Sequence, residues 1–389
     1  MGVIVRVAAR GDGITEDGRH AAFAAPGDLL EDDGTVVPGP HHQTPPCRHF
    51  PACGGCQLQH LDDESWSAFL HDRVTGALAA QGLEAEVRTP ALSPPQTRRR
   101  ASLHYDPAGK LGFAGEKSHE LVDLAECHVL APELFALVKP LKRLLPVFKP
   151  KRRLDVHLTL ADQGVELLVK GVTPSGLAHA DAIAAFARAH GLARVSFDGG
   201  YGAETHWEPD SVTVTFGGVA VPLPPAAFLQ ATREGEATLV AAMREALGAP
   251  RVTADLFAGL GTFALALPGR VYAAEGARDA VLALKAGAGR AQRSVFTEHR
   301  DLYRRPLTVA ELDRFDAVVL DPPRSGAREQ VEALAACKVP VIGYVSCNPS
   351  SFARDAKMLC EGGYRLDWVV PVGQFRWSTH VELAARFSR

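Results

Sequence analysis

The hydrophobic pattern of the second half of the chain alternates between two spacings. Short apolar runs bounded by turn residues, such as Val252–Ala258 and Phe315–Leu320, are typical of buried strands. Between such runs, apolar residues recur on one face at helical spacing, as in Glu234–Leu247, which is followed by a glycine. From Ala226 onward this alternation predicts an α/β unit, in which helices cover both faces of a parallel sheet.

The first half of the chain has different patterns. Residues 1–46 contain short alternating stretches separated by Gly and Asp turns, which predict a small β module built of hairpins. This module can be separate or an extension packed on its neighbour. Residues 47–225 combine a helix near 62–82 with hairpin strands and a later helix, which predicts an α+β domain that ends at a proline-rich border. We therefore expect three units, 1–46, 47–225 and 226–389.

The composition is that of a globular protein with more than one domain. The chain has 389 residues, of which 46% are hydrophobic and 22% are charged. No apolar run approaches the roughly 20 residues that span a bilayer, and the N-terminus lacks the layout of a signal peptide. These features predict a cytoplasmic protein with no membrane partner, which we expect to be a monomer.

The net charge of −3 means that a nucleic-acid partner would need a local basic patch. Lys139–Arg153 contains seven basic residues and no acidic one. Together with Arg98–Arg100, this segment is the best candidate for phosphate contacts. A solvated helix face and loop is the alternative for each residue taken singly.

Clustered cysteines indicate a metal centre. Cys47, Cys53 and Cys56 lie within ten residues on a loop rich in Pro and Gly. Such a compact triplet needs one distant fourth ligand, as iron–sulfur clusters often do, and Cys127 is the natural candidate. A zinc site that also uses a nearby histidine, and chance clustering without a metal, are the alternatives. The nearby histidines are His49, His60 and His128.

Several motifs of the second half suit a nucleoside ligand. A predicted strand leads into Gly259-Leu-Gly261, where glycines at a strand–helix turn let a ligand approach the backbone. Glu275 ends the next strand and can hydrogen-bond two ribose hydroxyls. Asp301 follows the third strand, and Asp321 begins a rigid Pro-Pro loop after the fourth. Because a Walker-type lysine is missing, a nucleoside without phosphates, such as S-adenosylmethionine, fits better than a triphosphate.

Cys347 stands where the apolar run Val339–Val345 ends in Asn-Pro. A cysteine at the carboxyl end of a strand lies where open α/β sheets bind ligands. A lone cysteine can equally be a buried structural thiol. The motifs upstream and Glu382 downstream favour a nucleophile instead.

Taken together, these motifs resemble the RNA uracil-5 methyltransferases (TrmA/RumA type), most closely the iron–sulfur branch that methylates 23S ribosomal RNA (RlmD/RumA type). The resemblance extends from residue 47 to residue 382, and the joint occurrence of its motifs in this order is specific. The motifs are Cys47-x5-Cys53-x2-Cys56 with Cys127, Phe228-Leu-Gln230, Asp255-Leu-Phe257-Ala-Gly-Leu-Gly-Thr262, Asp321-Pro-Pro-Arg-Ser-Gly, Ser346-Cys347-Asn348-Pro349 and His380-Val-Glu382.

The resemblance implies a Rossmann-like class I methyltransferase domain at the C-terminus, a central iron–sulfur domain and a truncated TRAM/OB-like module at the N-terminus. It implies Cys347 as the nucleophile and Glu382 as the base. The residues expected around S-adenosylmethionine and the target base are Gln230, Phe257, Thr262, Glu275, Asp301 and Asp321. The residues expected to hold a [4Fe–4S] cluster are Cys47, Cys53, Cys56 and Cys127.

The expected reaction follows from the chemistry of uracil, whose carbon 5 is a poor nucleophile towards a sulfonium methyl group. A thiolate that adds to carbon 6 makes an enolate with electron density at carbon 5. After methylation a base must remove the carbon-5 proton so that the thiol is eliminated, and partial burial would suit Glu382 to that step. The target base must leave its stack, and Phe228 is a candidate stacking partner.

The chain departs from the family in three places. The second half of the TRAM-like module is missing, which weakens RNA docking or reroutes it through Lys139–Arg153. Gly373–Ser378 stands where the family usually has Asp-x-Phe-Pro-His-Thr, which changes the base pocket, and Ser350-Ser-Phe replaces Thr-Leu after the nucleophile. The alternatives are a cytosine-5 methyltransferase, disfavoured because Asp321-Pro-Pro-Arg lacks a cysteine, methylation of transfer RNA or another RNA, and a catalytically weak RNA-binding protein that keeps the fold.

Overall fold

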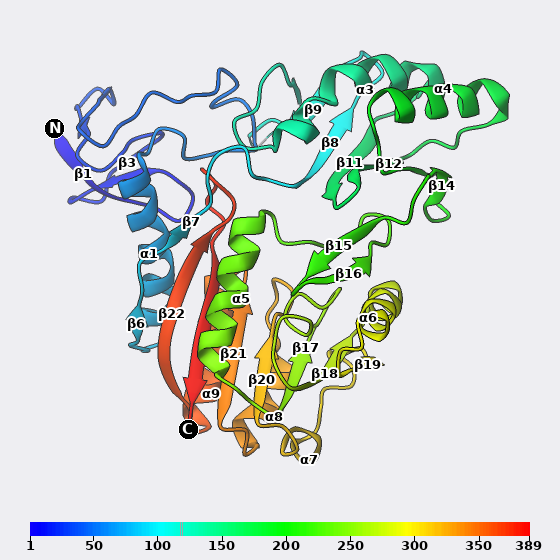
Figure 1. Cartoon of the computed structure of the whole chain (residues 1–389). Helices are drawn as coiled ribbons and strands as arrows, with labels where there is room; N and C mark the ends of the chain where they lie inside the picture. The colour runs from blue at the N-terminus through cyan, green and yellow to red at the C-terminus, as the bar shows by residue number, and fades with distance from the viewer. Residues whose placement is uncertain (117, 119) are drawn as a thin grey trace.

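The computed structural model of the chain describes residues 1–116, 118 and 120–389. Figure 1 shows a large C-terminal sheet with a central sheet and a small N-terminal sheet lying across one of its ends. No helix within the described residues is long and apolar enough to cross a membrane.

The C-terminal sheet has the strand order β19-β18-β17-β20-β21-β23-β22-β6, and β7 also pairs with β22. From β19 to β21 neighbouring strands are parallel, whereas β23 runs antiparallel to β21 and β22. The α/β architecture predicted from the alternating pattern is therefore confirmed. The strands after residue 226 are β17 (Val252–Leu256), β18 (Arg270–Glu275), β19 (Val295–His299), β20 (Ala317–Leu320), β21 (Val341–Ser346), β22 (Arg365–Gly373) and β23 (Glu382–Ser388).

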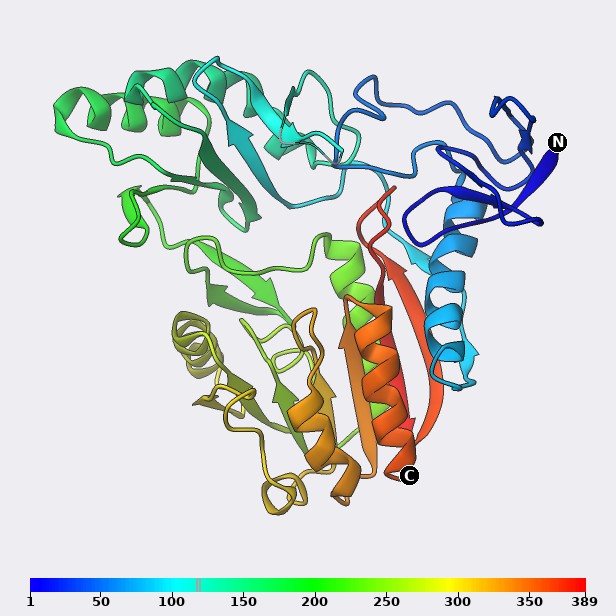
Figure 2. The same cartoon turned by 180° about the vertical axis from the view of Figure 1, so that it is seen from behind.

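Helices cover both faces of this sheet. α5 packs on one face, and Figure 2 shows α8 and α9 on the other. Leu239, Met243 and Leu247 recur at helical spacing on the buried side of α5, and Thr232 caps its first turn by accepting a 2.9 Å hydrogen bond from the Gly235 N–H. The helices of this unit are α5 (Arg233–Leu247), α6 (Arg278–Arg290), α7 (Val309–Leu312), α8 (Arg328–Ala336) and α9 (Pro349–Glu361).

The segment after β17 differs from the expected strand–helix turn. Residues 259–266 form consecutive turns rather than a helix. Leu260, Phe263 and Leu265 are all buried, so the segment lacks the polar face that a surface helix would have. The glycine-rich connection therefore lies packed between the sheet and α6.

Part of the first half of the chain also belongs to the C-terminal unit. Helix α1 (Asp63–Ala79) packs against β22 and α9, and β6 (Glu86–Val87) and β7 (Ala91–Leu92) extend the sheet parallel to β22. Packing thus does not follow the expected border between 47–225 and 226–389. Strands of two residues have no hydrophobic periodicity of their own, so their partner cannot be read from the sequence.

The central sheet has the strand order β10-β9-β8-β11-β12-β13-β14 and its own hydrophobic core. Its strands are β8 (Arg100–Tyr105), β9 (Leu111–Ala114), β10 (Leu121–Asp123), β11 (Leu154–Ala161), β12 (Gly164–Lys170), β13 (Arg194–Asp198) and β14 (Glu204–Trp207). The helices beside it are α2 (Pro132–Phe135), α3 (Val138–Leu144), η1 (Leu145–Phe148) and α4 (Gly176–Ala189). The hairpin of β15 (Thr213–Phe216) and β16 (Val219–Pro222) packs on α6 instead.

The N-terminal sheet has the order β3-β2-β1-β4-β5 and agrees with the predicted β hairpins. Its small core consists of four buried residues, and Val7 and Ala25 belong to the core of the C-terminal unit. This shared core favours the alternative of an extension packed on its neighbour. The strands are β1 (Gly2–Val7), β2 (Gly13–Thr15), β3 (His20–Ala21), β4 (Leu29–Leu30) and β5 (Val36–Val37).

Candidate active site

The register of two strands brings Cys347 and Glu382 together. In the antiparallel pair β21 and β23, Val341 lies opposite Ser388 and Ser346 lies opposite Leu383. Cys347 directly follows Ser346 and Glu382 directly precedes Leu383, so one further step of the register would oppose them, and the charge of Glu382 acts on the Cys347 thiol. Directly opposed residues of antiparallel strands are about 4.5–5.5 Å apart at Cα, so their side chains can meet.

The turn after β21 holds Cys347 in place. Asn348 is the N-cap of α9 and accepts a 3.1 Å hydrogen bond from the Ser350 N–H, with Pro349 as the first helical residue. The Asn348 side chain also donates to the carbonyl of Arg324 at 3.1 Å. Cys347 is therefore fixed between a buried strand and a capped helix, with its thiol half-buried.

Burial keeps both reactive groups protonated near neutral pH. It raises the pKa of the Cys347 thiol to about 11, with further contributions from the carboxyl groups of Glu382 and Asp321. It raises the pKa of Glu382, which is 5% exposed, to about 8. Asp321 adds to this rise, whereas a hydrogen bond from Gln374 and the charge of Arg100 oppose it. A carboxyl group with such a pKa can exchange a proton near neutral pH.

The carboxyl ends of β17, β18 and β20 bring three of the expected donor-site residues to one edge of the sheet. Phe257 follows β17 with a φ of 66°, and its ring centroid is 5.5 Å from that of Tyr303. Glu275 ends β18 and accepts hydrogen bonds from the N–H groups of Gly259 at 2.9 Å and Ala277 at 2.6 Å. Asp321 directly follows β20. This is the edge where open α/β sheets bind ligands.

Gly261 explains why the connection after β17 needs glycine. It has a φ of 95°, and a Cβ on it would lie 2.4 Å from Cδ1 of Leu284. Thr262 follows it and is partly exposed within the same turns. Asp301 lies after β19, where its exposed carboxylate accepts from the N–H groups of Tyr303 at 3.0 Å and Arg304 at 3.3 Å. Asp301 thus orders a turn after β19.

Two carboxyl groups lie deep in this unit. Burial raises the pKa of Asp255 to about 8 and that of Asp321 to about 7. Neither oxygen of Asp255 has a hydrogen-bond partner of ordinary geometry among the described residues, although the nearby N–H of Ala264 favours the charged form. Sequence reasoning used Asp255 only as part of a motif. The available signal was its position inside a predicted buried strand, because burial disfavours the charged form of a carboxyl group.

Gln230 and Gln374 form a chain of side-chain hydrogen bonds that ends at Asp321. Gln230, 4% exposed, donates from Nε2 to Oδ2 of Asp321 at 3.4 Å. Its Oε1 accepts a 2.7 Å hydrogen bond from Nε2 of Gln374. Gln374 was not singled out from the sequence. The available signal was its place in the segment that departs from the family, eight residues before Glu382.

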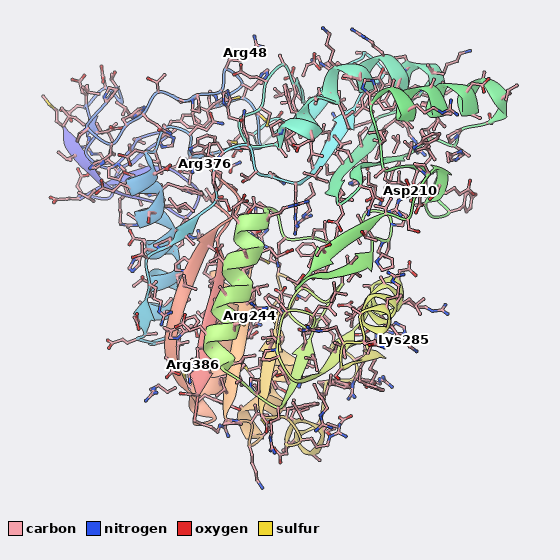
Figure 3. The ribbon with its side chains drawn as sticks, in the orientation of Figure 1. Arg48, Asp210, Arg244, Lys285, Arg376 and Arg386 are labelled. Atoms are coloured by element: carbon pink, nitrogen blue, oxygen red, sulfur yellow. The ribbon has the colours of Figure 1, made fainter. Side chains whose placement is uncertain are left out.

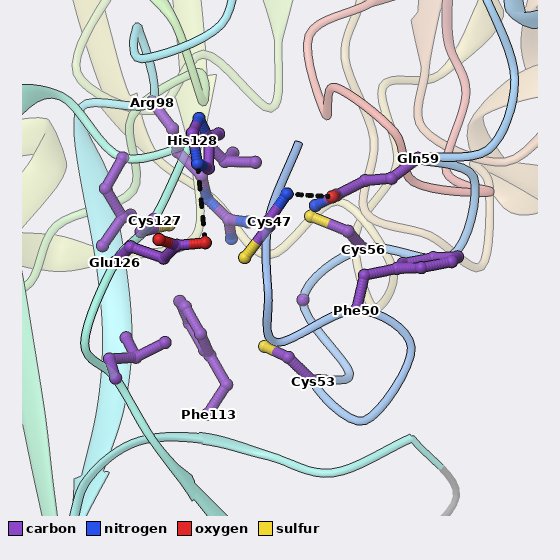
Figure 4. Close-up of a pocket in the computed structure, with 14 residues that line it drawn as sticks. Cys47, Phe50, Cys53, Cys56, Gln59, Arg98, Phe113, Glu126, Cys127 and His128 are labelled. Atoms are coloured by element: carbon purple, nitrogen blue, oxygen red, sulfur yellow. Dashed lines mark hydrogen bonds and ion pairs between the residues drawn. The ribbon is translucent and has the colours of Figure 1, made fainter. Parts of the chain in front are cut away.

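The four expected cluster ligands line one pocket, together with Phe50, Phe113 and Arg98. Figure 4 shows the sulfurs of Cys47, Cys53 and Cys56 turned towards the side where Cys127 lies. Burial raises the pKa of the thiols of Cys47, Cys53 and Cys56, the last to about 12. Of the nearby histidines, His128 lines this pocket, and His49 and His60 are not among its lining residues.

Several arginines lie near Cys347 and Glu382. The guanidinium of Arg100 lies 4.4 Å from the ring centroid of Phe228, whose side chain is 63% exposed. Burial lowers the pKa of Arg100 to about 10, and the positive charge of Arg98 lowers it further. Burial also lowers the pKa of His380, with contributions from Arg324, Arg98 and Arg73. The expected basic segment lies elsewhere, along α3 and η1 on the central sheet (Figure 1).

Comparisons with known proteins identify the family. The family model described as tRNA (uracil-5-)-methyltransferase matches residues 291–389, which include Cys347 and Glu382. An uncharacterised RNA methyltransferase of Zymomonas mobilis is 51% identical over 100% of both chains. The 23S rRNA (uracil(1939)-C(5))-methyltransferase RlmD of Halomonas elongata is 32% identical over 87% of this chain and 75% of its own.

Among solved structures, the tRNA (uracil-54, C5)-methyltransferase of Pyrococcus abyssi in complex with S-adenosyl-L-homocysteine is similar in fold. It matches with a TM-score of 0.78 and 24% identity over 99% of this chain and 98% of its own. This chain belongs to the RNA uracil-5 methyltransferase family.

Proposed function

We propose that the protein forms 5-methyluridine in 23S ribosomal RNA, with S-adenosylmethionine as the methyl donor. The observation that carries the proposal is that Cys347 and Glu382 flank the last pair of β21 and β23, close enough for the charge of Glu382 to raise the pKa of the Cys347 thiol. The ribosomal substrate is supported by the relative whose name specifies 23S rRNA. A transfer RNA substrate is the second candidate, favoured by the description of the matching family model.

In the proposed mechanism Cys347 loses its thiol proton to solvent and adds to carbon 6 of the target uracil. The S–C bond leaves an enolate whose electron density lies at carbon 5. S-adenosylmethionine would supply the electrophilic methyl group that carbon 5 takes up, and S-adenosylhomocysteine would leave with the electron pair of the broken S–CH3 bond. The ionised carboxylate of Glu382 then removes the carbon-5 proton, the S–C bond breaks, and Cys347 leaves as a thiolate.

The residues at the edge of the sheet fit a nucleoside donor. Glu275 has two carboxylate oxygens at the end of β18, where ribose hydroxyls bind in related arrangements. Phe257 and Tyr303 add aromatic surface beside it, and Gln230 and Asp321 add polar groups that face each other. We infer that Thr262 and Asp301 complete the donor site at its rim.

A [4Fe–4S] cluster held by Cys47, Cys53, Cys56 and Cys127 is part of the proposal, because these residues line one pocket. Among the described residues, only His41, Asp62 and Glu64 have three metal-ligating atoms that all lie within 4.8 Å of one another. The four sulfurs are therefore more widely spaced than the ligands of a single zinc ion, which at about 2.3 Å from the metal would be about 3.8 Å apart. Wider spacing suits a cluster of several iron atoms, which would position the loop since methyl transfer needs no electron.

The arginines near Cys347 and Glu382 support an RNA substrate. Burial lowers the pKa of His380, and the charges of Arg324, Arg98 and Arg73 lower it further, so positive charge lies near this residue, two positions before Glu382. Phosphates that flank a flipped nucleotide would neutralise this charge. Phe228, exposed beside Arg100, offers a ring for base stacking.

The experiment that tests the proposal is to map 5-methyluridine in ribosomal and transfer RNA from cells with and without the gene. Loss of one 23S site on deletion, restored by the wild-type gene, is the expected result. Loss of a transfer RNA site would assign the second candidate. Loss of a 5-methylcytidine, or no change in any modified nucleoside, would overturn the uracil-5 assignment and favour a cytosine enzyme or an RNA-binding role.

A further inference from the structure

We propose that Gln374 is a positioning residue of the active site, which fixes the orientation of the Gln230 amide and holds the Glu382 carboxyl in place for proton removal. This inference rests on the proposed function and adds a residue that the family motifs did not indicate. Gln374 lies in the loop after β22 and is 1% exposed.

Its hydrogen bonds determine the direction of a chain of side-chain amides. Oε1 of Gln374 accepts a 2.8 Å hydrogen bond from the N–H of Ala231, and a backbone N–H can only donate. Nε2 of Gln374 must therefore face Gln230 and donate to its Oε1 at 2.7 Å. The remaining Nε2 of Gln230 then faces Asp321 and donates to Oδ2 at 3.4 Å.

The same side chain also acts on the expected base, Glu382. Glu382 lies opposite Val372 in the pair β22 and β23, close to the point where Gln374 enters the loop. A hydrogen bond from the Gln374 side chain favours the charged form of Glu382, against burial and the negative charge of Asp321. One buried amide thus connects the donor side of the pocket to the base.

The surrounding backbone leaves room for this arrangement. A Cβ on Gly235, in the first turn of α5, would lie 2.7 Å from Cβ of Gln374. A Cβ on Gly373 would lie 2.8 Å from Leu70 and 2.9 Å from Trp66. Glycine at both positions lets the loop approach α5 and α1 closely enough for the amide to reach Gln230.

The test compares Gln374→Met with Gln330→Met. Gln330 is a matched control, because it is also 1% exposed and its side chain also makes two hydrogen bonds, to the N–H of Leu307 at 2.8 Å and to its carbonyl at 3.2 Å. It lies on α8 and takes no part in the proposed mechanism. Both variants lose a buried amide, so a merely structural effect should appear in both.

The first measurement is the pH dependence of the rate at which methylated RNA is released from Cys347 in a single turnover. Gln374→Met should shift the rise of this profile about half to one pH unit upward, because the carboxylate of Glu382 loses a hydrogen bond. Gln330→Met should keep the wild-type profile. Coincident profiles for Gln374→Met and the wild type would overturn the inference.

The second measurement needs no RNA and so separates this inference from the proposed function. Cys347 is alkylated with iodoacetamide over a pH series, and its modification is followed by peptide mass spectrometry. At about pH 8–9, Gln374→Met should react faster than the wild type and Gln330→Met, because a neutral Glu382 repels the thiolate less. If this difference appears while the wild type makes no 5-methyluridine, the function fails and the positioning role stands. Equal rates would count against the positioning role.

Discussion

Cys347 directly follows and Glu382 directly precedes the last paired residues of β21 and β23, Ser346 and Leu383, and the charge of Glu382 acts on the Cys347 thiol. The two residues are far apart in the sequence, and only the antiparallel return of β23 makes them neighbours. β23 interrupts the otherwise parallel direction of the neighbouring strands, and this reversal gives the site its second reactive group. The following predictions test what this arrangement does.

Replacing Cys347 by alanine should abolish transfer of a labelled methyl group from S-adenosylmethionine to RNA, by about three orders of magnitude or more, because no covalent route remains. Cys360→Ala is the matched control. Cys360 is a partly buried thiol on α9 outside the pocket, and its loss should leave the activity intact. Substantial activity in Cys347→Ala would exclude it as the nucleophile.

The rate at which methylated RNA is released from Cys347 in a single turnover should depend on the ionisation of Glu382. Burial raises its pKa to about 8, and only the ionised form can take the carbon-5 proton. Below about pH 8 the rate should therefore fall about tenfold for each pH unit, as Glu382 takes up a proton. Measuring the rate between about pH 6 and pH 9 checks this, and a rate that stays level below pH 8 would contradict the assignment.

Arg376 should be a major contributor to stability. Figure 3 shows it at the end of the C-terminal sheet, where its 11% exposed side chain forms an ion pair with Asp63. Its guanidinium also lies 5.3 Å from the ring centroid of Trp66 and 4.7 Å from that of Trp377. Arg376→Ala should lower the free energy of unfolding by about 2–3 kcal/mol, because the ion pair with Asp63 and the contacts with both tryptophan rings are lost together.

The control for Arg376 is Arg365→Ala. The side chain of Arg365 is 80% exposed and also forms an ion pair, with Asp367. Its loss should change the free energy of unfolding by less than about 1 kcal/mol. Urea denaturation measures both variants, and similar losses for the two would show that Arg376 does not join α1 to the C-terminal loop as the contacts indicate.

Protein purified without oxygen should contain about four iron atoms per chain and absorb broadly near roughly 400 nm. Cys53→Ser and Cys127→Ser should each lose iron, because each removes one of the thiols that line the pocket. Cys360→Ser should keep it. Colourless wild-type protein with about one zinc ion per chain would refute the cluster.

Some features could be predicted from the sequence because local patterns carried them. The strand periods and turn residues indicated the α/β unit, and Cys347 was visible at the end of an apolar run before Asn-Pro. The spacing of Cys47, Cys53 and Cys56 predicted a shared site with Cys127 as its distant fourth ligand, and all four residues line one pocket. These features depend on residues close together in the chain.

Other features depend on long-range packing and could not be predicted. The two-residue strands β6 and β7 join the C-terminal sheet through β22, and their own residues do not predict that partner. The turns at 259–266 replace an expected helix because apolar residues there are buried on several sides. The role of Gln374 depends on the backbone N–H of Ala231, which is far away in the sequence.

The most direct test of the central claim is intact-protein mass spectrometry of Glu382→Gln incubated with RNA and S-adenosylmethionine. Glutamine cannot take the carbon-5 proton, so the methylated base should remain bound, and peptide mapping should place it on Cys347. Glu361→Gln, a change at an exposed position on α9, should turn over without a stable adduct. Full turnover of Glu382→Gln with no adduct would contradict the assignment of Glu382 as the base that releases Cys347.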